Sequence, residues 1–166
     1  MLAFLDRIFG LPAHPLLVHV PVVLVPLSAL ALVGVAVRPG WRAAAGWWVV
    51  GLAFVALVSV QLAMTTGESL QEHVGDRVLV HQHASLAEPM RPLALAVLLL
   101  SVGLVLVDRR RARAWYRNTM LAVGGVSIVV AGASMVQVAR VGHSGAKAVW
   151  HDKGTSGPGG DDDRGQ

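Results

Sequence analysis

Four long apolar blocks, separated by short polar segments, dominate the sequence. They run over Leu16–Val37, Ala43–Met64, Pro92–Val107 and Thr119–Ala139. A transmembrane helix needs about 20 apolar residues, because each residue rises about 1.5 Å and the hydrocarbon layer is roughly 30 Å thick. The first, second and fourth blocks meet this length, and none of the four contains Asp, Glu, Lys or Arg. The pattern therefore predicts four membrane-spanning helices.

The third block has only 16 residues, which is short for a span. The segment before it, "ASLAEPM", is compatible with a helix apart from its proline. We therefore expect the third span to begin within this segment. A proline inside a helix removes one backbone hydrogen bond and bends the axis, so we expect a kink at Pro89 or Pro92.

The first block opens with the unusual stretch "HPLLVHVPVVLVP". Pro15 suits the first position of a helix, where its missing N–H costs nothing, and this places His14 near the N-cap. Pro21 and Pro26 fall in the predicted helix interior, where each should bend the axis. The bend would turn His19, about one turn into the block, toward the axis of the bundle.

Composition supports the membrane interpretation. Hydrophobic residues make up 54% of the 166 positions and charged residues 14%, whereas soluble domains carry about 25% charged residues. The net charge of +4 does not indicate nucleic acid, because the basic residues flank the apolar blocks. The chain has no cysteine, which excludes disulfides, thiolate metal sites and cysteine-ligated iron–sulfur clusters.

The basic residues also predict the orientation. The segments 38–42 and 108–118 lie on one side of the four spans. Seven of their 16 residues are arginines. They are Arg38, Arg42, Arg109, Arg110, Arg111, Arg113 and Arg117. The opposite side spreads seven basic residues over 69 positions, mixed with nine acids. Because arginine and lysine favour the cytoplasmic side, we expect an all-α integral membrane four-helix bundle with both termini outside.

Three regions follow from this arrangement. Residues 1–13 form an amphipathic segment that we expect to lie along the membrane surface. Residues 14–151 form the four-span membrane domain. Residues 152–166 are rich in glycine and aspartate, so we expect a disordered tail.

All seven histidines fall on the predicted outer side. They are His14, His19, His73, His81, His83, His143 and His151. His19 lies inside an apolar block, and an ionisable residue within a span indicates a functional site. Gln61, Thr65, Thr66 and Gln137 reach the same depth at the ends of the second and fourth spans.

This histidine cluster suits two kinds of ligand. Membrane b-type cytochromes hold haem between two imidazoles, with ring nitrogens about 4 Å apart, inside a helical bundle. Arg91 and Arg140 are placed to meet the haem propionates, but contact with lipid phosphates is the favoured role for both. Imidazoles also bind copper or zinc, for which the carboxylates of Glu68, Glu72 or Glu88 could be additional ligands. The sequence has no closely spaced metal-binding motif such as H-E-x-x-H. The spacing of the histidines therefore does not decide whether the ligand is haem, copper or zinc, or whether there is no ligand.

Several motifs resemble those of the family called domain of unknown function 2231, which consists of predicted bacterial membrane proteins. They are "HPLLVHVPVVLVPL" at 14–27, "TGESLQEHVG" at 66–75, "HASLAE" at 83–88 and "VGHSGAKAVWH" at 141–151. The resemblance covers roughly residues 10–151. It implies a four-span domain in the bacterial inner membrane, with His14, His19, His83 and His143 as the motif positions of a candidate cofactor site. Domains of this family also occur joined to Rieske-type or cytochrome modules, which implies a redox setting.

Three functions remain open at this point. The first is a haem- or metal-binding module that transfers electrons to a separate membrane partner. The second is a structural or accessory subunit whose histidines cap polar backbone at helix ends. The third is a transporter, proton relay or pH sensor, which is disfavoured because no ionisable group lies at mid-membrane. The lipid bilayer is the expected partner, with self-association as a further option and no nucleic acid.

Overall fold

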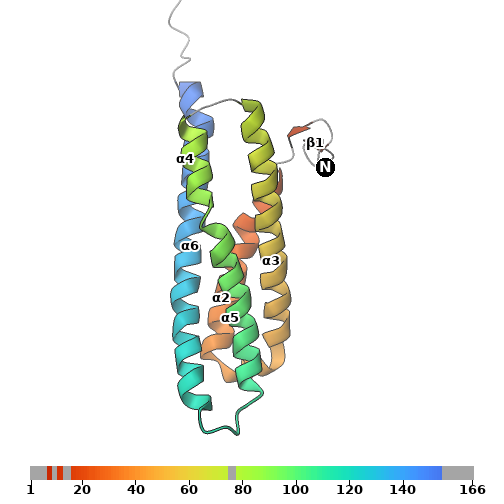
Figure 1. The fold of residues 1–166 in the computed structure, drawn as a ribbon, viewed down its shortest axis with the longest axis vertical. Coiled ribbons are helices and arrows are strands. Elements are labelled where there is room, and N and C mark those ends of the chain that lie inside the picture. The colour runs from red at the N-terminus through yellow and green to blue at the C-terminus, as the bar shows by residue number, and fades with distance from the viewer. Residues whose placement is uncertain (1–6, 9–10, 13–15, 75–77, 155–166) are drawn as a thin grey trace, which may run out of the picture.

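The computed structural model describes residues 7–8, 11–12, 16–74 and 78–154. Its long helices run side by side along one direction and form an elongated bundle (Figure 1). The elements are β1 (Arg7–Ile8), β2 (Leu11–Pro12), α2 (His19–Val37), α3 (Pro39–Val74), α4 (Val78–Ala87), α5 (Met90–Asp108) and α6 (Tyr116–Gly154).

The all-helical membrane prediction is confirmed within the described part of the chain. Four helical segments there are long and apolar enough to cross a membrane. They are His19–Val37, Pro39–Ser69, Val80–Asp108 and Tyr116–Lys147. Each contains one of the predicted apolar blocks or most of it, because the length of an apolar run is a local property of the sequence.

The third span begins upstream of its apolar block, as predicted. It combines α4 and α5, which are separated by a turn at Glu88 and Pro89. The backbone resumes helical bonding when Leu93 N donates to the Pro89 carbonyl at 3.2 Å. Pro92 lies in the first turn of α5, where its missing N–H costs little. The predicted kink is therefore at Pro89.

The first span differs from the prediction at its start. A turn at Val18 interrupts the helix, and α2 begins at His19. Pro21 is consequently in the first turn of α2, not in the helix interior, and only Pro26 is an interior proline. Because Pro21 has no N–H to donate to the carbonyl four residues earlier, the helix cannot continue regularly through this point. His14 and Pro15 lie outside the described residues.

The segment before the bundle contains a short antiparallel pairing. Arg7 pairs with Pro12, and Ile8 pairs with Leu11. This ladder is all that the structure describes within the predicted surface segment 1–13. The position of that segment relative to the membrane stays a prediction.

The helices pack through residues spaced alternately by three and four positions. On α5 the buried stripe with this spacing is Met90, Ala94, Val97, Ser101 and Leu104, and Val105 is buried beside it. The buried stripe on α3 has the same spacing over Val49, Ala53, Ala56, Val60 and Ala63. This spacing keeps one face toward the neighbouring helices and is typical of helical bundles. Small residues fill many of these positions, so the backbones can approach closely.

Buried serines in the core bond to their own helices. Their hydroxyls donate to carbonyls three or four residues earlier, at 2.7–2.9 Å. These residues are Ser28, Ser59, Ser101, Ser127 and Ser134. Their hydroxyl protons are therefore satisfied without a ligand. The middle of the bundle is a packing region, and the polar contacts between helices lie toward its two ends.

Candidate functional site

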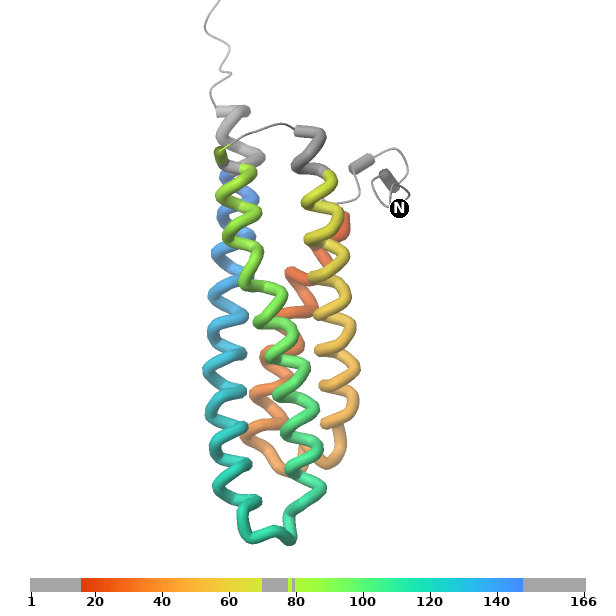
Figure 2. The backbone as a smooth tube through the Cα atoms, viewed as in Figure 1, coloured from red at the N-terminus to blue at the C-terminus, as the bar shows by residue number. Residues whose placement is uncertain are grey.

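The histidine-bearing end of the bundle is organised around α4 and α6. Before the turn at Glu88 and Pro89, α4 runs beside the C-terminal half of α6 (Figure 2). Its contact with α3 is much smaller. The side chains that join α4 to α6 therefore decide how this end is built.

His83 on α4 makes the central contact with α6. Its Nδ1 lies 2.9 Å from Oγ of Ser144, and that hydroxyl donates to the Val141 carbonyl, also at 2.9 Å. A hydroxyl has a single proton, so while Ser144 donates to Val141 it can only accept from His83, and this arrangement requires the tautomer with the ring proton on Nδ1. In the neutral imidazole, Nε2 then keeps its lone pair.

Gly145 allows His83 to lie against the backbone of α6. A Cβ atom at this position would lie 3.2 Å from Cε1 and 3.5 Å from Nδ1 of the imidazole. The first distance is tighter than an ordinary contact, so a Cβ here would require the ring to move by a few tenths of an ångström. The sequence "HSG" at 143–145 thus supplies the acceptor and the space that the His83 ring requires.

A second hydrogen bond joins the same two helices closer to the core. Nε2 of Gln137, a buried side chain on α6, donates to the carbonyl of Leu86. Leu86 is next to the end of α4, where the last carbonyls of a helix have no intrahelical partner. Gln137 therefore satisfies one of these carbonyls at the kink of the third span.

Arg91 and Glu68 form an ion pair between α5 and α3 at this end. The distance from Nη2 of Arg91 to Oε1 of Glu68 is 2.9 Å, and the two side chains are 41% and 64% exposed. Nε of Arg91 is buried and has no hydrogen-bond partner among the described residues. Arg140, the other arginine considered for haem propionates, is exposed on α6.

The predicted site residues are placed as follows. His83 is half-buried between α4 and α6, and His143 is exposed on α6 next to Ser144. His19 is the first residue of α2 and is exposed, and His14 lies outside the described residues. Within the described residues there is no group of three or more His, Asp or Glu side chains that could hold a metal. This finding does not bear on haem ligation, which needs only two imidazoles.

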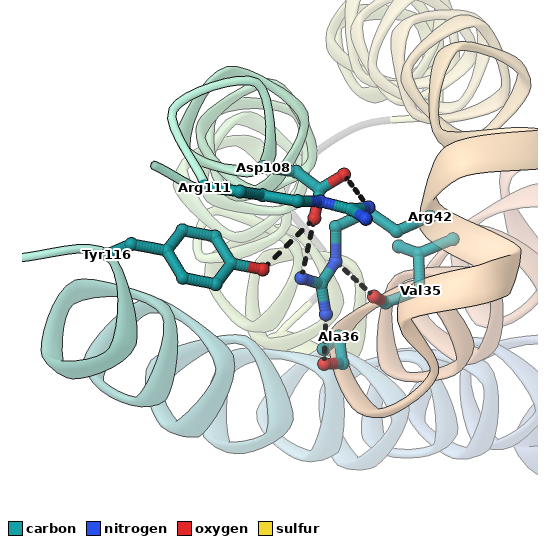
Figure 3. A network of polar contacts seen from close by, with 6 residues as sticks. All are labelled: Val35, Ala36, Arg42, Asp108, Arg111 and Tyr116. Atoms are coloured by element: carbon teal, nitrogen blue, oxygen red, sulfur yellow. Dashed lines mark hydrogen bonds and ion pairs between the residues drawn. The ribbon is translucent and has the colours of Figure 1, made fainter. Parts of the chain in front are cut away.

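Among the described residues, the most buried charged side chain is that of Arg42, at the opposite end, and the sequence did not single it out. Figure 3 shows its polar contacts. The side chain of Arg42 is only 2% exposed. Its Nε and Nη2 donate to the carbonyls of Val35 and Ala36, both at 2.8 Å. These carbonyls belong to the last turn of α2, where backbone carbonyls have no N–H partner within the helix. Arg42 supplies the missing donors. The sequence suggested only a topological role for this arginine.

Asp108, the last residue of α5, completes this cluster. Its Oδ1 accepts from Nη1 of Arg42 at 3.1 Å and from the Tyr116 hydroxyl at 3.2 Å, and its Oδ2 accepts from Arg111. The hydrogen bond to Asp108 also raises the pKa of Arg111 above its ordinary value. We call Arg42, Asp108, Arg111 and Tyr116 the arginine clamp. It joins the ends of α2, α3, α5 and α6.

The sequence did contain a signal for the clamp. Asp108 is the single acidic residue in the two arginine-rich segments. A lone carboxylate among seven arginines at helix ends must pair with some of them. The sequence could not identify which arginine, because Arg42 is 66 residues away.

The fold and the two polar ends define a class of protein, a helical membrane protein with four candidate spans. The family model described as "Predicted membrane protein (DUF2231)" matches residues 10–158. The chain therefore belongs to this family, and the predicted resemblance is confirmed. No curated protein and no solved structure matches the chain.

Proposed function

We propose that the chain is a membrane redox module that holds haem b, or alternatively copper, where α4 meets α6. Zinc has no redox chemistry, so a zinc ion at this place would make the site a metal-binding site without electron transfer. The single observation that carries this proposal is the orientation of His83. When Nδ1 donates to Ser144, which lies 2.9 Å away, the Nε2 lone pair is left to bind a ligand. In histidine ligands, the N–H of the ring nitrogen that does not bind the metal characteristically donates a hydrogen bond to a protein acceptor. This bond fixes the tautomer and the ring orientation.

His143 is the natural second ligand. It precedes Ser144, so it lies within one residue of the contact that holds His83. His19, at the start of α2, and His14 are the further candidates, and α2 packs directly against α6. Two imidazoles are sufficient for the axial positions of haem iron, and the group would supply one-electron chemistry when bound.

The test is an optical spectrum of protein purified in mild detergent from haem-replete cells, oxidised and then reduced with dithionite, together with elemental analysis. We expect a Soret band that shifts on reduction and is lost in His83→Ala. Ser144→Ala should weaken binding about 10- to 100-fold, because such supporting hydrogen bonds contribute that much to ligation.

His81→Ala is the matched control. His81 is on the same helix two residues earlier, where it faces another direction, and it is exposed. The control should keep the spectrum. A preparation that is colourless and metal-free, and that does not bind added haem, copper or zinc, would refute the cofactor proposal.

A second candidate is an accessory membrane subunit whose histidines only support packing. The contact of His83 with Ser144 and Gly145 favours it, because this contact already satisfies one polar group on each helix. In this case His83→Gln, which keeps a donor and an acceptor, should leave a membrane complex assembled and active. Loss of assembly in His83→Gln, with a normal melting temperature, would argue against a packing role.

We also infer that the arginine clamp lies at the cytoplasmic face of the bacterial inner membrane, with both termini outside. The support is the density of arginine at this end. A reporter active only in the periplasm, such as alkaline phosphatase, should be active when fused after residue 166. A reporter fluorescent only in the cytoplasm should be dark at that position. The reverse result would invert the orientation.

A further inference from the structure

We infer that Arg109, Arg110 and Trp47, beside the arginine clamp, form a docking surface for the headgroups of anionic phospholipids. This inference concerns the opposite end of the bundle and is independent of the cofactor proposal. It rests on the balance of charges, on an arginine–tryptophan contact and on the local fold of the segment between α5 and α6.

The charges at this end are strongly unbalanced. Asp108 is the only acidic residue there, and both of its oxygens are engaged by Arg42, Arg111 and Tyr116. Five exposed arginines have no acidic partner among the residues described. They are Arg38, Arg109, Arg110, Arg113 and Arg117. Such a surface attracts anions, and most strongly those presented at high density.

Two of these arginines lie over tryptophan rings. The guanidinium carbon of Arg109 is 5.3 Å from the ring centroid of Trp47, and that of Arg38 is 4.9 Å from the ring of Trp41. Both distances are within the range of cation–π attraction. The contact holds the guanidinium in place without using its N–H groups, which remain available for phosphate.

The segment between α5 and α6 is folded by its own backbone. Arg110 N donates to the Val107 carbonyl and Arg113 N to the Arg110 carbonyl, both at 2.9 Å. Tyr116 N donates to the Arg113 carbonyl at 3.0 Å. The bond from Arg111 to Asp108 anchors the middle of the segment. The arginines are therefore displayed from a series of turns, which lowers the entropy lost on binding.

The tryptophans identify the occupant as lipid. Trp47 and Trp48 are 52% and 81% exposed and belong to a span, so they meet the membrane at the level where indole rings prefer to lie. A phosphodiester at this level belongs to a phospholipid. The unpaired positive charge selects lipids with a net negative headgroup over zwitterionic ones.

The test compares lipid retention by the full chain in detergent, measured by native mass spectrometry. Phosphatidylglycerol and phosphatidylcholine of equal chain length are supplied at equal concentration. The wild type should retain phosphatidylglycerol preferentially, and high salt should reduce the preference. Arg109→Gln combined with Arg110→Gln should reduce it about tenfold or more, since each arginine near the surface contributes about fivefold.

The matched control is Arg140→Gln combined with Lys147→Gln. These residues are also exposed, and the change removes two charges from the opposite end. The control should retain phosphatidylglycerol as the wild type does. Equal retention of the two lipids by the wild type, or equal losses in the two double variants, would overturn the inference. The salt dependence of the wild type decides the question if the first double variant does not fold.

Discussion

At each end of the bundle an arginine–carboxylate pair joins two different helices, and these two pairs differ in burial. Arg42 and Asp108 are 2% and 11% exposed, and Arg42 also bonds two backbone carbonyls. Arg91 and Glu68 are 41% and 64% exposed, and no further hydrogen bond of either side chain is seen within the described residues. A buried ion pair is costly to break because the remaining charge is left without compensation, whereas an exposed pair contributes little.

This difference suggests a division of roles. The arginine clamp joins four helix ends in one network, so it should hold the bundle together. The arginine–carboxylate pair described at the histidine end is more exposed, and α4 there is supported mainly by α6. An end of this kind can accommodate a ligand or partner with less loss of packing.

Asp108→Ala is expected to have the largest effect on stability. It leaves the guanidinium of Arg42 buried without its carboxylate and removes the acceptor of the Tyr116 hydroxyl. The free energy of unfolding should fall by about 3 kcal/mol, the lower end for breaking a buried pair, because Asp108 is slightly exposed. Titration of the purified protein with a denaturing detergent measures this change. A loss below about 1 kcal/mol would show that the clamp does not stabilise the bundle.

Gly46→Ala tests the packing beside the clamp. The added Cβ would lie 2.7 Å from Cγ2 of Val105 on α5, so either the buried Val105 side chain or the two helices must shift. We expect a loss of about 1–3 kcal/mol, which is typical of overpacking. Gly51→Ala is the control on the same helix, since its Cβ would meet nothing within 4 Å. It should be neutral or stabilise by about 1 kcal/mol or less. Similar losses in the two variants would show that the contact between Gly46 and Val105 does not limit the packing of α3 against α5.

Gly145→Ala makes the same change at the histidine end. Here the added Cβ approaches Cε1 of His83 at 3.2 Å, and the ring can yield more easily than a buried valine. We expect a loss of about 1 kcal/mol or less. Hydrogen exchange should nevertheless become faster in α4 than in the wild type, with α5 unchanged. Uniform acceleration across both helices would show that α4 does not open independently.

Glu68→Ala should have the smallest effect. It removes the partner of Arg91 in an exposed pair, and such pairs contribute about 0–1 kcal/mol. The free energy of unfolding should therefore change far less than in Asp108→Ala under the same conditions. An equal effect of the two substitutions would remove the distinction between the two ends.

Local features of the sequence predicted the membrane architecture well. The apolar blocks identified the four spans, and the prediction of a kink at Pro89 or Pro92 placed the break in the third, which the structure has at Glu88 and Pro89. The prediction that Pro21 lies in the helix interior was wrong, because α2 begins only after the turn at Val18. The length of an apolar run does not specify where such a turn falls. The site prediction stays untested, although His83 is the one predicted ligand whose surroundings now give it a specific orientation.

The sequence by itself determined the number of spans and the distribution of charge between the two sides, because both depend on runs of neighbouring residues. Only the tertiary structure decided the partners across helices. Arg42 meets Asp108 over 66 residues, and His83 meets Ser144 over 61. Such pairs depend on the rotation and register of packed helices, and an apolar stripe constrains these only loosely. The same histidine in a rotated helix would face lipid, and the same arginine would lie in the headgroup layer.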